Sequence, residues 1–285
     1  MCGGPPTVLA MSTRVEVGGG VLLEADLWEG GVREPFLLVH GLSSNRRTWE
    51  RVAARLHELG HPVATVDMRG HGRSDSPDEG YDFETMGADL VRVLDAVGFR
   101  TAVLAGQSTG GNIVVDVASR APDRVAGVVG VDGGALELSR QWPDWEECKV
   151  ALTPPRLVGS PAATVEGYVR RGHPTWSDWG IEVTMANFEH RPDGTIRPWL
   201  TLDHHLRILR SLWEHHPSAV IPKLDAAVLL VMADTGDDWV THKRALADEL
   251  VASSSNVRVE WFSPGDHDLH IQYPVELADL LHRAF

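Results

Sequence analysis

Hydrophobic residues alternate with polar ones near the start of the chain and form short apolar runs further on. The alternation in residues 12–17 and 21–27, around three glycines, predicts an opening β-hairpin. The later runs predict buried strands, and the segments between them carry apolar residues at helical spacing. The predicted strands are 36–39, 61–66, 101–105, 125–131, 227–232 and 257–261, and the predicted helices are 49–59, 90–97, 113–118, 241–251 and 274–285.

Unbroken apolar strands separated by amphipathic helices are typical of a mostly parallel sheet with helices on both faces. The sequence therefore predicts an α/β fold with a doubly wound sheet. Periodicity weakens between residues 134 and 222, a stretch too long for a plain loop in a compact domain. We expect a core domain made of residues 1–133 and 223–285, with residues 134–222 inserted as a helical cap, or lid.

Charge and hydropathy narrow the range of partners. The chain has 26 Lys and Arg against 40 Asp and Glu, a net charge of −14, which disfavours binding to nucleic acid or to anionic membranes. No apolar run approaches the ~18–20 residues that span a bilayer, and the first residues lack the pattern of a secretory signal. We therefore expect a cytoplasmic monomer or homodimer that acts on a small molecule.

The strongest chemical signal is the segment GQSTG at residues 106–110, directly after a predicted strand and before a helix. A strained strand-to-helix turn of this kind exposes a nucleophile, and its glycines leave room for neighbouring backbone. The turn lifts the Ser108 oxygen clear and aims the Thr109 amide at an oxygen that becomes negative during attack. The alternative interpretation is a glycine-rich turn without chemistry.

A serine nucleophile needs a base, and the base needs an acceptor that holds its tautomer. The predicted base is His267, which follows the last predicted strand, and His270 is its rival. For the acceptor the sequence offers Asp234, Asp237 and Asp238 after one strand and Asp132 after another. Each of these could instead be a loop carboxylate or a helix N-cap.

Four motifs in this order resemble the α/β-hydrolase-fold family, over residues 12–285 apart from the cap. They are the oxyanion-loop segment HGL at 40–42, the turn DMRGHGRS at 67–74, the nucleophile elbow at 106–110, and GDH at 265–267 followed by Pro274. The resemblance implies that Ser108 is the nucleophile and His267 the base. It also implies an oxyanion hole formed by the amides of Leu42 and Thr109, and neither cofactor nor metal.

One departure from the family pattern concerns the acid. The family usually has Gly-x-x-Asp after the penultimate strand, but here Gly236 stands where the acid would fall. One extra loop residue would restore the pattern, so Asp237 is the predicted acid. The resemblance gives Asp67 and His71 structural roles in their turn. The cluster DHDLH at 266–270 could be imagined as a metal site, but no second cluster of suitable spacing accompanies it.

Serine at the nucleophile position indicates an acyl–enzyme intermediate. Epoxide hydrolases and haloalkane dehalogenases of this fold use Asp there, so those activities are disfavoured. The sequence predicts a serine hydrolase that cleaves a small to medium apolar ester, lactone or related acyl bond. A thioesterase or a carbon–carbon bond hydrolase with the same triad is an alternative. The irregular acid loop also leaves open a non-catalytic sensor or carrier of the same fold.

The inserted segment is rich in tryptophan and histidine. Two tryptophan pairs at i, i+3 spacing could each share one helical face and line an apolar pocket, or they could pack the cap onto the sheet. The histidine pairs 204–205 and 215–216 are expected at the polar surface, although one could contact substrate. The candidate pocket residues are Trp142, Trp145, Trp176 and Trp179.

Overall fold

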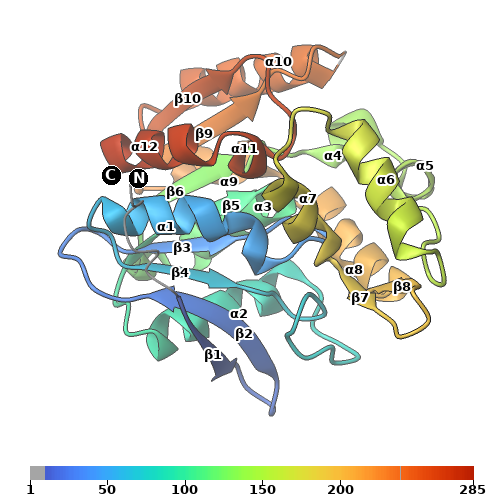
Figure 1. The fold of residues 1–285 in the computed structure, drawn as a ribbon. Helices are drawn as coiled ribbons and strands as arrows, with labels where there is room; N and C mark the ends of the chain where they lie inside the picture. Colours follow the sequence, from blue (N-terminus) through green and yellow to red (C-terminus); the bar gives the residue numbers. More distant parts are fainter. Residues whose placement is uncertain (1–9, 238) are drawn as a thin grey trace, which may run out of the picture.

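The computed structural model describes residues 10–237 and 239–285, and its centre is an eight-stranded sheet (Figure 1). The strand order is β1-β2-β4-β3-β5-β6-β9-β10. Strands β1 and β2 form the predicted hairpin, β2 runs antiparallel to β4, and the remaining neighbours are parallel. The strands are β1 (Met11–Glu16), β2 (Leu22–Trp28), β3 (Phe36–Val39), β4 (Val63–Val66), β5 (Ala102–Gln107), β6 (Val125–Val131), β9 (Val228–Ala233) and β10 (Val257–Phe262).

Helices cover both faces of this sheet, which confirms the predicted fold class (Figure 1). Side chains of a strand point alternately to its two faces. Phe36 and Leu38 therefore join the core under α1 and α12, whereas Leu37 and Val39 join the core under α2, α3 and α10. The helices are α1 (Glu50–Glu58), α2 (Phe83–Ala96), α3 (Thr109–Arg120), α10 (Trp239–Ser253), α11 (Leu269–Gln272) and α12 (Pro274–Ala284), with 3₁₀ turns η1 (Arg46–Trp49), η2 (Pro122–Arg124) and η3 (Ile221–Lys223).

The segment between β6 and β9 is largely helical, and it also contains a two-stranded hairpin that the sequence pattern did not reveal. Part of it has a small core of its own, built from Val165, Ile181, Met185 and Ile196. The division into two domains at residues 134 and 222 stays a prediction. The elements are α4 (Leu138–Gln141), α5 (Trp145–Leu152), α6 (Ala162–Gly172), α7 (Asp178–Met185), β7 (Phe188–His190), β8 (Ile196–Pro198), α8 (Leu202–Glu214) and α9 (Pro217–Val220).

Within the described residues, no helix combines the length and the apolar character that crossing a membrane requires.

Candidate active site

Ser108 occupies the turn between β5 and α3 in a strained backbone conformation, with φ 52° and ψ −124°. A positive φ is unusual for a residue with a side chain and marks a constrained turn. The turn is so tight that a Cβ atom at Gly106 would overlap the backbone of Gly110, and one at Gly110 would overlap the His40 carbonyl. The glycines of the 106–110 motif are therefore what allows this turn to form.

His267 and Asp132 form the central polar contact of the site. Nδ1 of His267 lies 2.6 Å from Oδ2 of Asp132. The Asp132 side chain is almost fully buried, at 1% exposed, whereas 48% of the His267 side chain is accessible. The loop that carries His267 is also tied to the elbow, because the side-chain amide of Gln107 donates to the His267 carbonyl oxygen. The imidazole is thus held on one edge and open to the cavity described below.

The prediction that Asp237 is the acceptor for His267 is wrong in this structure. Oδ1 of Asp237 accepts hydrogen bonds from the Thr235 hydroxyl and the Trp239 amide, so this carboxylate stabilises its own turn at the start of α10. Asp132, in contrast, directly follows β6, which lies between β5 and β9 in the sheet. The His267 ring contacts Asp132 at the carboxyl end of β6.

Asp234, another candidate carboxylate, has hydrogen-bond partners other than His267. Asp234 accepts hydrogen bonds from Arg244 and from the Ser263 hydroxyl. Asp238 lies outside the described residues. Asp132, one of the alternatives left open by the sequence, is therefore the carboxylate that the structure pairs with His267.

The pairing shifts the titration of both groups. Burial by itself would lower the pKa of His267, but the hydrogen bond to Asp132 and the charges of Asp268 and Asp132 outweigh it, so the pKa is raised. Burial would likewise raise the pKa of Asp132, yet its hydrogen bond with His267 and the positive charge of Lys243 lower it instead. Both shifts favour an ionic pair, as expected when opposite charges share a buried contact.

His270, the rival base, is fully buried against the ring of Trp49, with 4.6 Å between the ring centroids. Neither of its ring nitrogens has a hydrogen-bond partner among the described residues. Burial lowers its pKa to about 3, so the ring is neutral at ordinary pH. This environment suits a packing residue, and His270 lines neither of the cavities described below.

The oxyanion-loop segment is held by two neutral histidines. The Met68 amide donates to Nε2 of His40, and the Ser43 amide donates to Nε2 of His71. Burial lowers the pKa of His40 to about 4 and that of His71 to about 3, so both nitrogens stay available as acceptors. The backbone on either side of Leu42 is fixed in this way.

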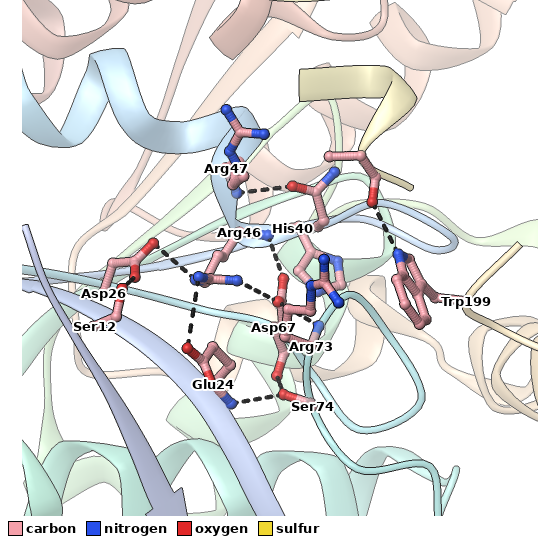
Figure 2. Close-up of polar contacts among 12 residues, drawn as sticks. Ser12, Glu24, Asp26, His40, Arg46, Arg47, Asp67, Arg73, Ser74 and Trp199 are labelled. Carbon is pink, nitrogen blue, oxygen red and sulfur yellow. Dashed lines mark hydrogen bonds and ion pairs between the residues drawn. The ribbon is translucent and has the colours of Figure 1, made fainter. Parts of the chain in front are cut away.

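Arg46, shortly after this segment, is held by two carboxylates, one from β2 and one from the turn after β4 (Figure 2). The Arg46 guanidinium contacts Asp26 at 2.7 Å and Asp67 at 2.6 Å, and its backbone amide also donates to Asp67. The Asp67 carboxylate additionally accepts from the Arg73 amide. Asp67 and His71 therefore have the structural roles that the family resemblance implied.

Two cavities meet at Ser108 and differ in character. One, of about 410 Å³, has walls that are largely apolar and include Leu138 of α4, Leu152 of α5 and Leu209 of α8. The other, of about 160 Å³, is lined by polar side chains that include Thr184, Asn187 and Asp268. Leu42, Ser108 and His267 line both cavities, and Thr109 lines the larger one. The predicted nucleophile, base and oxyanion amides thus converge on one place.

None of the four tryptophans predicted as pocket residues lines either cavity among the described residues. Trp142 and Trp145 pack against other tryptophans, Trp239 and Trp213. Trp176 donates to Asp266, and Trp179 donates to Glu50, so both join the inserted segment to the core. Trp142, Trp176 and Trp179 thus contact residues outside the inserted segment, whereas the ring partner of Trp145 lies within it.

The larger cavity is lined by a different tryptophan, which lies outside the insertion, and by a histidine of the insertion. Trp239, at the start of α10, lines it, and so does His205 of α8. His205 is buried, and its Nδ1 lies 2.9 Å from the Ser43 hydroxyl. His204 and His215 are also buried, so only His216 of the two pairs is at the surface as expected. The i, i+3 spacing of the tryptophan pairs therefore did not identify the aromatic residues that line the cavity at Ser108.

In residues 10–237 and 239–285, His, Cys, Asp and Glu side chains form no group of three or more that could hold a metal ion. Three side chains of the DHDLH segment at 266–270 contact different partners. Asp266 accepts from Trp176, His267 meets Asp132, and His270 packs on Trp49.

Comparison with known proteins assigns the chain to a family. Residues 34–193, more than half of the chain, match the model of the alpha/beta hydrolase fold family. The chain therefore belongs to the α/β-hydrolase fold family, in agreement with the motifs and with the observed sheet.

The relatives cover several activities. A putative non-heme haloperoxidase of Mycobacterium phage D29 is 38% identical over 37% of this chain and 38% of its own length. A 2-(acetamidomethylene)succinate hydrolase of Mesorhizobium japonicum is 34% identical over 43% of this chain and 42% of its own. The similarity to these curated relatives thus spans less than half of their length.

Solved structures resemble the whole chain but at low identity. An E-2-(acetamidomethylene)succinate hydrolase covers 96% of this chain and 98% of its own, with a TM-score of 0.76 and 22% identity. The thioesterase domain of a curacin biosynthetic pathway covers 95% and 98%, with a TM-score of 0.74 and 20% identity. At this identity the likeness establishes the fold.

Proposed function

We propose that this protein is a serine hydrolase that cleaves a carboxylic ester, lactone or related acyl bond through an acyl–enzyme. The observation that carries the proposal is the His267–Asp132 pair, which opens onto the same cavities as Ser108 on its strained elbow. A serine, an imidazole and a buried carboxylate in this relation are the groups that acyl transfer needs.

The reaction proceeds in two halves. Ser108 Oγ attacks the substrate carbonyl while Nε2 of His267 takes the hydroxyl proton, and the amides of Leu42 and Thr109 donate to the developing oxyanion. His267 then gives the proton to the leaving group, and the acyl–enzyme remains. A water molecule, activated by the same imidazole, attacks the acyl–enzyme and releases the acid and free Ser108. Throughout, Asp132 accepts from Nδ1 and stabilises the imidazolium.

The two cavities suggest the form of the substrate. The larger cavity contains Leu42 and Thr109, the donors of the oxyanion hole, so the acyl group extends into its apolar walls. The smaller cavity, with Thr184, Asn187 and Asp268, takes a small polar leaving group. Relatives named as esterase, thioesterase and succinate-derivative hydrolase all fit acyl-bond cleavage. A thioester or a carbon–carbon bond is therefore an alternative for the scissile bond.

A fluorophosphonate probe and a panel of para-nitrophenyl esters test the proposal. The unmodified protein is expected to react covalently with the probe and to hydrolyse the esters. Ser108→Ala is expected to lose both properties, because the attacking oxygen is gone. Hydrolysis that persists in Ser108→Ala would rule out this mechanism. A protein that neither reacts with the probe nor turns over any ester would instead support the sensor or carrier alternative.

A further inference from the structure

A partly buried lysine, Lys243, contacts the Asp132 carboxylate of the His267–Asp132 pair and also lines the larger cavity. Nζ of Lys243, on α10, is 2.8 Å and 2.9 Å from the two carboxylate oxygens of Asp132 and 3.0 Å from the Ala233 carbonyl oxygen. The side chain of Lys243 is only 11% exposed. Burying an ammonium group is costly unless its donors are all satisfied, and here three acceptors meet its three N–H groups.

Lys243 completes the hydrogen bonding of the Asp132 carboxylate. Oδ1 accepts from Lys243 and from the Ala233 amide, and Oδ2 accepts from Lys243 and from His267. The backbone of Asp132 has φ 41°, an unusual value for a residue with a side chain. The carboxylate is thus fixed from two sides in the orientation that receives the imidazole.

We infer that Lys243 is a positioning residue of the active site, which orients the Asp132 carboxylate toward His267 and offsets part of its negative charge at the imidazole. The inference rests on the proposed function, since it assigns Lys243 a role in the same proton transfer. None of the sequence motifs included this residue.

The charges around His267 give the direction of the effect. Asp132 and Asp268 favour the protonated imidazole, and Lys243 disfavours it. Asp237, in the loop before α10, lines the same cavity. His270 from α11 and His205 from α8 are neutral, because burial lowers the pKa of each ring. With Asp132 still in place, removing the lysine charge therefore raises the pKa of His267.

Two substitutions of Lys243 separate its role in orienting Asp132 from the effect of its positive charge. Lys243→Gln keeps one N–H donor near Asp132 but removes the charge, whereas Lys243→Met removes both. For Lys243→Met we expect kcat to fall about tenfold to a hundredfold with KM changed less than threefold, since misplaced catalytic groups lose rate rather than affinity. For Lys243→Gln we expect a smaller fall in kcat. In both, the acidic limb of the kcat/KM profile moves to higher pH.

The matched control is Lys149→Met on α5; the Lys149 side chain is 38% exposed and pairs with Glu146, and the variant is expected to behave like the unmodified protein. Unchanged kcat in both Lys243 variants would overturn the inference. So would an acidic limb that stays in place or moves to lower pH, because Lys243 would then not offset the charge of Asp132 at the imidazole.

An NMR titration of the His267 ring in the Ser108→Ala background separates this inference from the proposed function. The ring is expected to titrate at higher pH when Lys243→Gln is added, whether or not the protein hydrolyses any ester. Absence of Ser108-dependent turnover would contradict the proposed function alone, whereas an unmoved ring titration would contradict the role of Lys243 alone.

Discussion

At the scale of single residues, the site shows which chemistry a local motif can predict. Ser108 and His267 each stand in a short segment whose neighbours define the turn, and the structure brings both to the same cavities. The carboxylate partner of His267 is different, because any carboxylate at the correct sheet edge could serve. Asp132 meets His267 only through the arrangement of β5, β6 and β9, which no local sequence pattern contains.

Substituting the carboxylates one at a time tests this reassignment. Asp132→Asn is expected to lower kcat about 10³-fold to 10⁴-fold, because the amide no longer stabilises the imidazolium or its tautomer. Asp237→Asn is expected to cost less than tenfold, since this carboxylate lines the larger cavity but makes its hydrogen bonds to Thr235 and Trp239 of its own turn. Ester hydrolysis under saturating substrate measures both.

Asp234→Asn serves as the control for these carboxylates, because Asp234 bonds to Arg244 and Ser263 and does not line either cavity. Its activity is expected to match that of the unmodified protein. A larger loss in Asp237→Asn than in Asp132→Asn would return the acid to the β9–α10 loop.

At the scale of elements, hydrophobic periodicity predicted the sheet well and the inserted segment poorly. Strands 36–39 and 125–131 have the observed bounds, because each is a continuous apolar run between turns. Most helices of the insertion are short and bury only a few residues each. Their apolar residues therefore give a weak helical pattern in the sequence. Helix α8, the longest of its helices, nevertheless forms a wall of the larger cavity through Leu209 and Leu212.

Helix α8 should therefore control acyl chain length. Leu209 is buried and lines the larger cavity, so Leu209→Trp fills part of its volume. We expect kcat/KM for para-nitrophenyl octanoate to fall at least tenfold relative to acetate, while hydrolysis of acetate changes little. Steady-state kinetics across acetate, butyrate, hexanoate and octanoate esters measures the shift.

Leu202→Trp is a matched control on the same helix, because Leu202 is 42% exposed and lines neither cavity. Its chain-length preference is expected to equal that of the unmodified protein. An equal shift in both variants, or none in Leu209→Trp, would place the acyl group outside this cavity.

At the scale of the whole molecule, four neutral histidines link folding to pH. Burial lowers the pKa of His40 and His215 to about 4 and that of His71 and His270 to about 3. In the unfolded chain each ring binds a proton near pH 6.5, whereas in the folded protein it does not. Their contribution to stability is therefore complete above pH 6.5 and is lost as the pH falls toward 3.

Thermal unfolding between pH 8 and pH 5 should show this loss. Below about pH 6.5, each histidine contributes a decrease of up to about 1.4 kcal/mol in unfolding free energy per pH unit, whereas between pH 8 and about pH 6.5 its contribution is nearly constant. His270→Phe keeps the ring contact with Trp49 but removes the titrating group. We expect the variant to lose less of its Tm than the unmodified protein between pH 7 and pH 5. Parallel curves for the two proteins would contradict this account.

The position of Asp132 has a consequence for redesign of the protein. Ser108 and Asp132 both precede the segment between β6 and β9, and His267 follows it on a loop attached to the sheet. Exchanging the region around α5 and α8 for that of another family member would thus leave the strands and loops that carry Ser108, Asp132 and His267 unchanged. The leucines of α4, α5 and α8 that line the larger cavity are thus encoded apart from Ser108, Asp132 and His267, although Leu42 and Trp239 of the remaining chain line the same cavity.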